Sequence, residues 1–196
     1  MTLLDSKNFC GKVRAHRVSP RPNGEFWQPV TDLKNNTVLY QWTQIASRLF
    51  ANGSANYRIA GMYLEFENVA SPGDAVSVPT FDRTRSISYY NDLAGSSNRD
   101  YLRVPLTGVQ TLSEGADLTD NQLVFFARSS GTLGVHGKTF SDSSNSVIFG
   151  ASLAAFPDNN DATQDLLFSS FYFSVSEQQP KLATSQVGIE WELTLQ

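Results

Sequence analysis

Apolar and polar residues alternate without a break over residues 187–196. One side of an extended chain there would carry five apolar side chains, those of Val187, Ile189, Trp191, Leu193 and Leu195. The polar residues Glu190, Glu192 and Thr194 would lie on the opposite side, because successive side chains of a strand point to opposite faces. The pattern predicts a half-buried β-strand.

Other segments rich in aromatic and β-branched residues are typical of strands. They cover residues 57–68, 76–90 with a kink at Pro79, 101–106, 122–129, 132–140, 147–156 and 167–176. Residues 167–175 are apolar on both faces, which indicates a central strand covered on each side. Short polar turns separate the segments. Strands of this length and spacing predict an all-β fold, a jelly-roll-like antiparallel β-sandwich.

One stretch has the period of a helix instead. Its apolar positions repeat at three- and four-residue spacing: Val38, Trp42, Ile45, Ala46, Leu49 and Phe50. Asn36 or Thr37 can cap the start, and Asn52-Gly53 can close the end. We expect one short helix over about residues 37–50, packed against a sheet or an end of the sandwich.

Residues 1–35 show no lasting period, and Pro20, Pro22 and Pro29 break any helix there. The segment is nevertheless too apolar for a solvated tail. It predicts an extended N-terminal arm that lies on a surface, either its own or a partner's, followed by a sandwich domain over residues 36–196.

Composition and charge narrow the class of protein. The chain has 196 residues, 40% of them hydrophobic and 17% charged, which fits one globular domain. Cys10 is the lone cysteine, so no internal disulfide is possible. The N-terminus lacks the apolar run of a signal peptide, and no run of about 18 apolar residues predicts a membrane span. We expect a soluble protein made in a cytoplasm.

The net charge of −4 is unevenly distributed. Residues 1–60 carry eight Lys/Arg against three Asp/Glu, whereas residues 61–196 carry seven against sixteen. A basic arm on an acidic body can pair with an acidic neighbour, including another copy, or it can be ordinary surface charge. The candidate interface residues of the arm are Phe9, Arg14, Arg17, Arg21, Phe26 and Trp27.

Groups of residues that carry chemistry are scarce. His16 and His136 are the only histidines and lie far apart in the sequence, so we expect no metal site and no catalytic Cys–His pair with Cys10. Gly137-Lys138-Thr139 lacks the spacing and the helix of a phosphate loop. The chain is acidic and has no nucleic-acid-binding motif, so we expect no such partner despite the arginines of the arm.

Three sets of carboxylate side chains are candidates for a metal-binding or catalytic role. Asp158, Asp161 and Asp165 could offer oxygen ligands to Ca²⁺, but their spacing is more typical of turns. The pairs Glu65/Glu67 and Glu190/Glu192 could serve glycoside cleavage. Each pair lies opposite an apolar face, and we expect a solvated sheet face at both.

The combination of an N-terminal arm, one helix and a jelly-roll-like body resembles the small structural proteins of tailed-phage virions. Residues 59–68 (IAGMYLEFEN) and Pro72-Gly73-Asp74 followed by Phe81-Asp82-Arg83 have the character of that group. Capsid cement or decoration proteins look most similar within it. The resemblance implies a non-enzymatic virion protein without catalytic residues or cofactors, which binds the major capsid protein or another virion protein as a homo-oligomer.

A second hypothesis is a receptor- or carbohydrate-binding module of a tail fibre. It would need exposed aromatic residues with Asp or Asn at one end of the sandwich. Tyr89-Tyr90-Asn91-Asp92, with residues 98–101, is the candidate loop. A hydrolase built from carboxylates is the third hypothesis.

Overall fold

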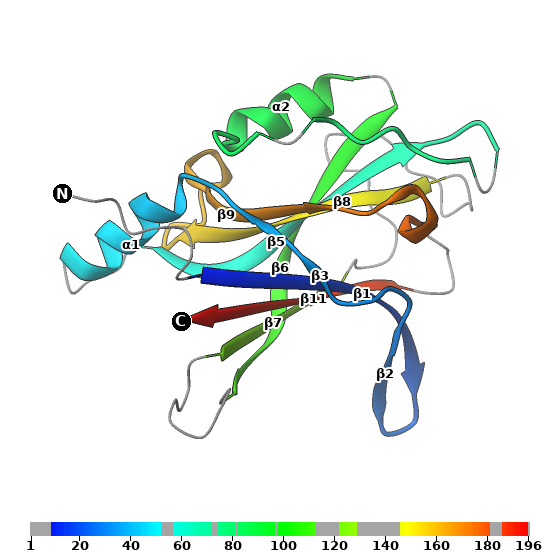
Figure 1. The fold of residues 1–196 in the computed structure, drawn as a ribbon, viewed down its shortest axis with the longest axis horizontal. Helices are drawn as coiled ribbons and strands as arrows, with labels where there is room; N and C mark the ends of the chain where they lie inside the picture. The colour runs from blue at the N-terminus through cyan, green and yellow to red at the C-terminus, as the bar shows by residue number, and fades with distance from the viewer. Residues whose placement is uncertain are drawn as a thin grey trace.

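The computed structural model describes residues 9–51, 57–71, 74–80, 82–96, 98–112, 122–128, 146–180 and 186–195. Its strands are β1 (Phe9–Arg21), β2 (Gly24–Pro29), β3 (Lys34–Asn35), β4 (Thr37–Val38), β5 (Tyr57–Asn68), β6 (Arg99–Leu112), β7 (Gln122–Arg128), β8 (Ser146–Pro157), β9 (Leu166–Tyr172), β10 (Gln179–Pro180) and β11 (Gln186–Leu195). Its helices are α1 (Trp42–Ala51) and α2 (Ile87–Gly95), with short 3-10 helices η3 (Ala162–Gln164) and η4 (Val175–Glu177). Figure 1 shows their arrangement.

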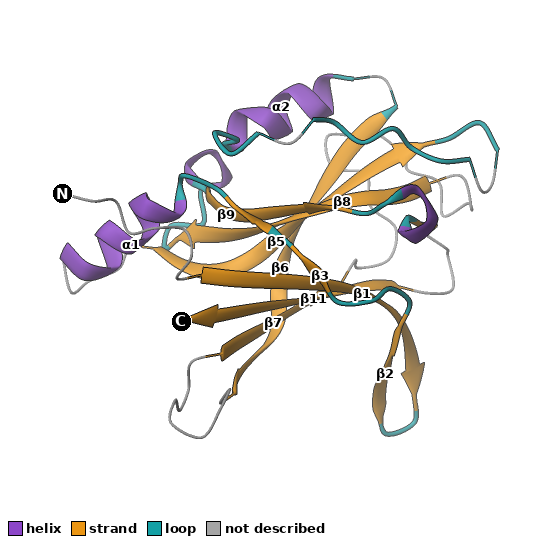
Figure 2. Ribbon diagram, viewed as in Figure 1, coloured by secondary structure: helices purple, strands orange, loops and turns teal. Residues whose placement is uncertain are grey.

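The described strands form one continuous sheet in the order β2-β1-β11-β7-β6-β5-β8-β9-β4, with β3 paired to β1 and β10 to β8. Every pairing is antiparallel. The long strand β6 joins two halves, because it pairs with β5 up to Pro105 and with β7 from Leu106 onward. The sheet therefore curls into two facing layers (Figure 2). The predicted all-β antiparallel sandwich is confirmed, and jelly-roll connectivity stays a prediction.

Most predicted strands match observed ones. The segments predicted at 57–68, 122–129, 147–156, 167–176 and 187–195 correspond to β5, β7, β8, β9 and β11. The strand predicted over 101–106 is part of the longer β6. The strand predicted over 132–140 lies outside the described residues.

Apolar side chains from both layers fill the space between them. Val13 of β1, Met62 and Leu64 of β5 and Trp191 of β11 belong to one cluster and are all 0% exposed. Burying such side chains is the main stabilising contribution to a fold of this kind, at about 1.5–3 kcal/mol for each large aliphatic or aromatic group.

The helix α1 lies at one end of the two layers (Figure 1). Its Ile45 is buried in the interior cluster and Trp42 packs against the same cluster, as the apolar stripe predicts. The helix begins later than residue 37, because Thr37 and Val38 pair with β9 as strand β4. No helix among the described residues is long and apolar enough to span a membrane.

A second apolar cluster covers the other face of β5, β8 and β9. It brings together Tyr63, Phe149 and Leu167 of the strands with Tyr90 and Leu93 of α2. Figure 2 shows α2 lying over this layer. Strand β8 is consequently buried along its whole length, and the first five residues of β9 are buried as well. The prediction of a strand covered on both faces is confirmed for the first residues of β9 and is wrong for the end of the predicted range, because Val175 is 63% exposed.

The strand predicted over 76–90 is wrong. Residues 87–95 form the helix α2, and the described residues between 74 and 86 contain no strand. Ile87, Tyr90, Leu93 and Ala94 recur at helical spacing and pack on the sheet. The aromatic Tyr89-Tyr90 pair favoured a strand locally, but packing against the sheet selects the helix.

The predicted N-terminal arm is part of the sheet over its described residues. Strand β1 pairs with β11 from Phe9 to Val18 and is flanked on its other side by β2 and β3. Val13 and Ala15 are 0% exposed in the interior cluster, so the chain's first described segment helps to form the core. The backbone is extended as predicted, and residues 9–35 contribute β1, β2 and β3 to the sheet of the body itself.

Candidate functional site

Strands β1 and β2 form a hairpin that projects from the body, and we call residues 16–29 the β1–β2 hairpin (Figure 1). The turn consists of Pro22 and Asn23, and Gly24 follows with a φ of 128°. Gly24 suits this position because other residues rarely adopt such a backbone conformation. Five of the six residues of β2 are exposed.

One face of the β1–β2 hairpin gathers three of the candidate interface residues. Arg17 pairs with Gln28, Ser19 with Phe26, and Arg21 with Gly24, so these residues share a face. Arg17 and Arg21 are exposed, and Phe26 is 40% exposed. The Arg21 guanidinium lies 3.8 Å from the centroid of the Phe26 ring. This face therefore presents a cationic and aromatic surface to the solvent.

The other face holds the hairpin against the sheet. Trp27 makes edge contacts with the rings of His16 and Phe126, at centroid distances of 5.6 Å for both. A Cβ on Gly188 would lie 2.8 Å from Cε3 of Trp27, so only glycine leaves room for the indole. Glu25 of the hairpin forms an ion pair with Arg128 of β7.

Two further candidate interface residues thus have partners within the chain. Arg14 donates to Glu190 at 2.7 Å, and Trp27 packs as described above. Phe9 pairs with Leu195 through the backbone, but its side chain lies outside the described residues. The structure brings Arg17, Arg21 and Phe26 together and separates them from Arg14.

Glu190 links strands β11 and β1 on the outer face of the sheet. It accepts hydrogen bonds from Arg14 at 2.7 Å and from His16 Nε2 at 2.5 Å. Burial alone would raise the pKa of Glu190, but the hydrogen bonds and charges of His16 and Arg14 lower it to about 2. The side chain is only 10% exposed, so the prediction of a solvated Glu190 is wrong.

A second buried carboxylate, Glu65 of β5, lies beneath α2. Its Oε1 accepts from Arg85 Nη1 at 3.1 Å and from the Tyr90 hydroxyl at 3.1 Å. Its Oε2 accepts from the Tyr89 hydroxyl at 2.7 Å. Glu65 is 0% exposed and Arg85 is 5% exposed. The prediction that Glu65 lies on a solvated face is therefore wrong, because α2 and the segment before it cover that face.

The groups around Glu65 form a closed network. Arg85 also donates to the Tyr172 hydroxyl and lies over the Tyr89 ring at 3.7 Å. The Ser152 hydroxyl lies 2.6 Å from the Tyr90 hydroxyl and donates to it, because the single Tyr90 proton is directed to Glu65. Burial raises the pKa of the Tyr89 and Tyr90 hydroxyls, so both stay protonated and act as donors. Burial also raises the pKa of Glu65, against the opposing effect of the Arg85 charge.

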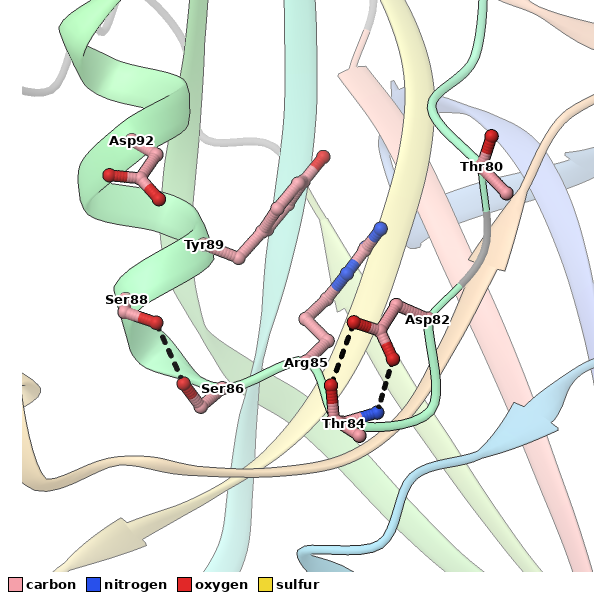
Figure 3. Close-up of a pocket in the computed structure, with 8 residues that line it drawn as sticks. All are labelled: Thr80, Asp82, Thr84, Arg85, Ser86, Ser88, Tyr89 and Asp92. Atoms are coloured by element: carbon pink, nitrogen blue, oxygen red, sulfur yellow. Dashed lines mark hydrogen bonds between the residues drawn. The ribbon is translucent and has the colours of Figure 1, made fainter.

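A polar pocket opens beside this network, between α2 and the segment before it (Figure 3). Its volume is about 220 Å³, and its lining consists of Thr80, Asp82, Thr84, Arg85, Ser86, Ser88, Tyr89 and Asp92. Asp82 accepts hydrogen bonds from the amide and hydroxyl of Thr84, at 2.8 and 2.7 Å. The pocket offers hydroxyls and carboxylates to a polar ligand, whereas Glu65 is enclosed and cannot reach one.

The candidate calcium residues are divided between different roles. Asp165 is buried and accepts from Arg103 Nε at 2.6 Å and from the Tyr63 hydroxyl at 2.6 Å. Asp161 caps η3 by accepting from the Thr163 amide at 3.0 Å. No group of three or more His, Cys, Asp or Glu residues in the described part of the chain could hold a metal ion.

Sequence reasoning missed the Glu65 network. The one available signal was a carboxylate in the middle of an apolar run, since Leu64 and Phe66 flank Glu65. Its partners could not be found locally, because Arg85 and Tyr172 are 20 and 107 positions away in the chain. His136 and the side chain of Cys10 lie outside the described residues, so their predicted lack of a role stays a prediction.

No family model, no curated protein and no solved structure matches this chain. The function is therefore argued from the residues and their geometry.

Proposed function

We propose that this protein is a non-enzymatic structural component of a tailed-phage virion, a cement or decoration protein that binds and stabilises the shell. The observation that carries the proposal is the projecting β1–β2 hairpin, with Arg17, Arg21 and Phe26 on one exposed face. A rigid sandwich that extends a cationic and aromatic surface is suited to contacting an acidic neighbouring subunit.

The burial and pairing of the candidate carboxylates support a binding role over a hydrolytic one. Glu65, Asp165 and Glu190, the buried members of the candidate groups, are each held by arginine. Their arrangement ties secondary-structure elements together, since α2 is anchored through Glu65 and β1 is anchored through Glu190. A glycosidase needs two carboxyl groups that both reach the substrate.

The carbohydrate-binding alternative depends on exposed aromatic side chains in residues 89–92. Tyr90 is 0% exposed, and the Tyr89 hydroxyl is directed to Glu65. The pocket beside them is lined by Asp92, several hydroxyls and Tyr89, but the Arg85 guanidinium lies over the Tyr89 ring at 3.7 Å and occupies a surface on which a sugar ring would stack. This geometry favours the assembly role.

The direct test is the composition of the particle. Virions purified from the strain that encodes the chain should contain it in many copies. Particles made without it should release their DNA at a lower temperature, measured with a DNA-binding dye during heating. Absence of the chain from intact particles would contradict the proposal.

A variant locates the binding surface. Replacing Arg17 and Arg21 with Glu should weaken binding to particles that lack the protein by about tenfold or more, because opposite charges at an interface become like charges. Arg58→Glu/Arg83→Glu is the matched control, since it changes the net charge equally and both arginines are exposed and lie outside the hairpin. Equal loss in the control would indicate a general effect of net charge.

A further inference from the structure

Strand β2 forms one edge of the sheet. It pairs with β1 on one side, and the sheet order places no described strand on its other side. The opposite edge is β4, which is only two residues long. Exposed edges pair readily with another strand, and proteins usually protect them with charged side chains, proline or a bulge. Residues 24–28 contain no proline, their one charged side chain, Glu25, is paired with Arg128, and their pairing with β1 is regular.

The hydrogen-bonding pattern identifies the groups on this free edge. Val30 N donates to the Ala15 carbonyl at 2.9 Å, so the backbone groups of Val30 point toward β1. Because the backbone groups of a strand point alternately to its two sides, every second residue counted back from Val30 also points toward β1. Gln28, Phe26 and Gly24 therefore bond to β1. Glu25 and Trp27 direct their N–H and C=O groups away from β1, and Pro29 ends the run because it has no N–H.

We infer that this edge pairs with β2 of a second copy of the chain, in antiparallel orientation, with Glu25 opposite Trp27 and Phe26 opposite Phe26. Both outward-facing residues of each copy then form hydrogen-bonded pairs, with about four backbone hydrogen bonds in all. A register shifted by two residues either way loses some of these hydrogen bonds. One shift sets Trp27 opposite a residue of the turn, and the other sets Glu25 opposite Pro29, which has no N–H.

The side chains and the shape fit a second copy. The register sets the two Phe26 side chains side by side on the exposed face, where cross-strand aromatic pairs are favourable. Glu25 faces Trp27 on the other face, so no like charges are directly opposed. The hairpin projects from the body in Figure 1, and Phe26 lies on its exposed face, opposite the face on which Trp27 contacts Phe126 of β7.

The inferred dimer adds to the proposed function, because it makes a second copy of the chain one of the partners. Only the biological role of the dimer rests on the proposed function. The two are tested separately. Self-association is measured on the isolated protein, and shell binding is measured on particles. A protein that binds particles but stays monomeric would overturn the inference alone.

The first experiment is a crosslink in a Cys10→Ser background. Phe26→Cys should give a disulfide-linked dimer under mild oxidation, because opposed residues in a non-hydrogen-bonded pair have Cα atoms about 4.5–5.5 Å apart. Gln28→Cys is the matched control on the same strand and face. Its two sulfurs would be more than about 13 Å apart in this register, beyond the reach of a disulfide. Equal crosslinking of both variants would overturn the register.

The second experiment removes one outward N–H without touching the β1–β2 ladder. Glu25→Pro should weaken dimerisation about tenfold to a hundredfold in sedimentation experiments, since the twofold symmetry removes two hydrogen bonds together. Glu25→Gln keeps the amide and should dimerise like the wild type. Circular dichroism checks that both variants are folded. A monomeric wild type at hundreds of micromolar, or a Glu25→Pro variant that dimerises unchanged, would refute the pairing.

Discussion

Removing the positive charge from the Glu65 network tests whether this network anchors α2. In Arg85→Met, the Glu65 carboxylate loses its charged partner but stays buried, and it keeps the hydroxyls of Tyr89 and Tyr90 as donors. The side chains of Glu65 and Arg85 are 0% and 2% exposed, so water cannot replace the lost interaction without a rearrangement. The substitution therefore leaves an uncompensated charge in the interior.

The expected cost is about 3–5 kcal/mol of unfolding free energy near neutral pH, which is the usual range for breaking a buried ion pair from one side. This is a large share of the about 5–15 kcal/mol that stabilises a typical domain. The double variant Glu65→Gln/Arg85→Met removes both charges and should recover about 1–3 kcal/mol, since a buried amide costs less than a buried carboxylate.

The sign of the pH dependence follows from the direction of the pKa shift. Burial already raises the pKa of Glu65, and loss of Arg85 raises it further. A carboxyl whose pKa is raised in the folded state destabilises the fold at pH values above that pKa. The destabilisation decreases as the pH falls and is gone below the pKa that the carboxyl has in the unfolded chain. The deficit of Arg85→Met relative to the wild type should therefore shrink between pH 8 and pH 4.

Urea unfolding followed by circular dichroism at several pH values measures these differences. Lys34→Met is the control, because the Lys34–Glu177 pair at 2.9 Å has a lysine side chain that is 45% exposed. Such surface pairs contribute about 0–1 kcal/mol. The reasoning is refuted if Arg85→Met costs less than about 1 kcal/mol, or if the double variant is no more stable than the single one at any pH.

Two further substitutions test the anchoring of β1 and the hairpin. Glu190 has a pKa of about 2 in the folded protein against 4.5 ordinarily, so its contribution is present above about pH 4.5 and is lost as the pH falls toward 2. Glu190→Gln should remove up to about 3 kcal/mol of that pH-dependent stability. The loss is measured by comparing the unfolding free energies of the variant and the wild type as the pH is lowered. A difference between them that does not change with pH would contradict the prediction. Gly188→Ala should destabilise the protein by about 1–3 kcal/mol and change the Trp27 fluorescence, because the new Cβ would overlap the indole. Gly95→Ala has no atoms within 4 Å of its Cβ and should be nearly neutral in thermal unfolding. Equal melting temperatures for the two alanine variants would contradict the crowding argument.

The strands that the sequence predicted well are those whose own pattern of apolar and polar residues indicates a strand. The alternation over 187–195 and the doubly apolar run over 167–175 appear as β11 and β9, because side-chain direction in a strand is set by the local backbone. The helix α1 was identifiable for the same reason. The segment over 87–95 was misjudged, since its tyrosines have strand propensity and only the sheet beneath them selects the helix.

The candidate site was predictable only in part. Arg17, Arg21 and Phe26 were identified as interface candidates, and the structure places them on one face of the β1–β2 hairpin. The same reasoning grouped Arg14 with them, although its partner Glu190 lies 176 positions away in the chain. Residue type identified candidate polar and aromatic contacts, but the identity of a distant partner left no local trace.

The sequence by itself determined the class of fold, because hydrophobic periodicity and turn residues act within a few neighbours and specify most of the strands and the helix α1. Only the tertiary structure decided that β1 joins the C-terminal strand β11, that Glu65 and Glu190 are buried and paired, and that β2 is left at an edge. The physical reason is one of range. Burial and strand pairing depend on which segments the closed sheet brings together, and the cost of burying a charge depends on a partner that arrives from a distant part of the chain.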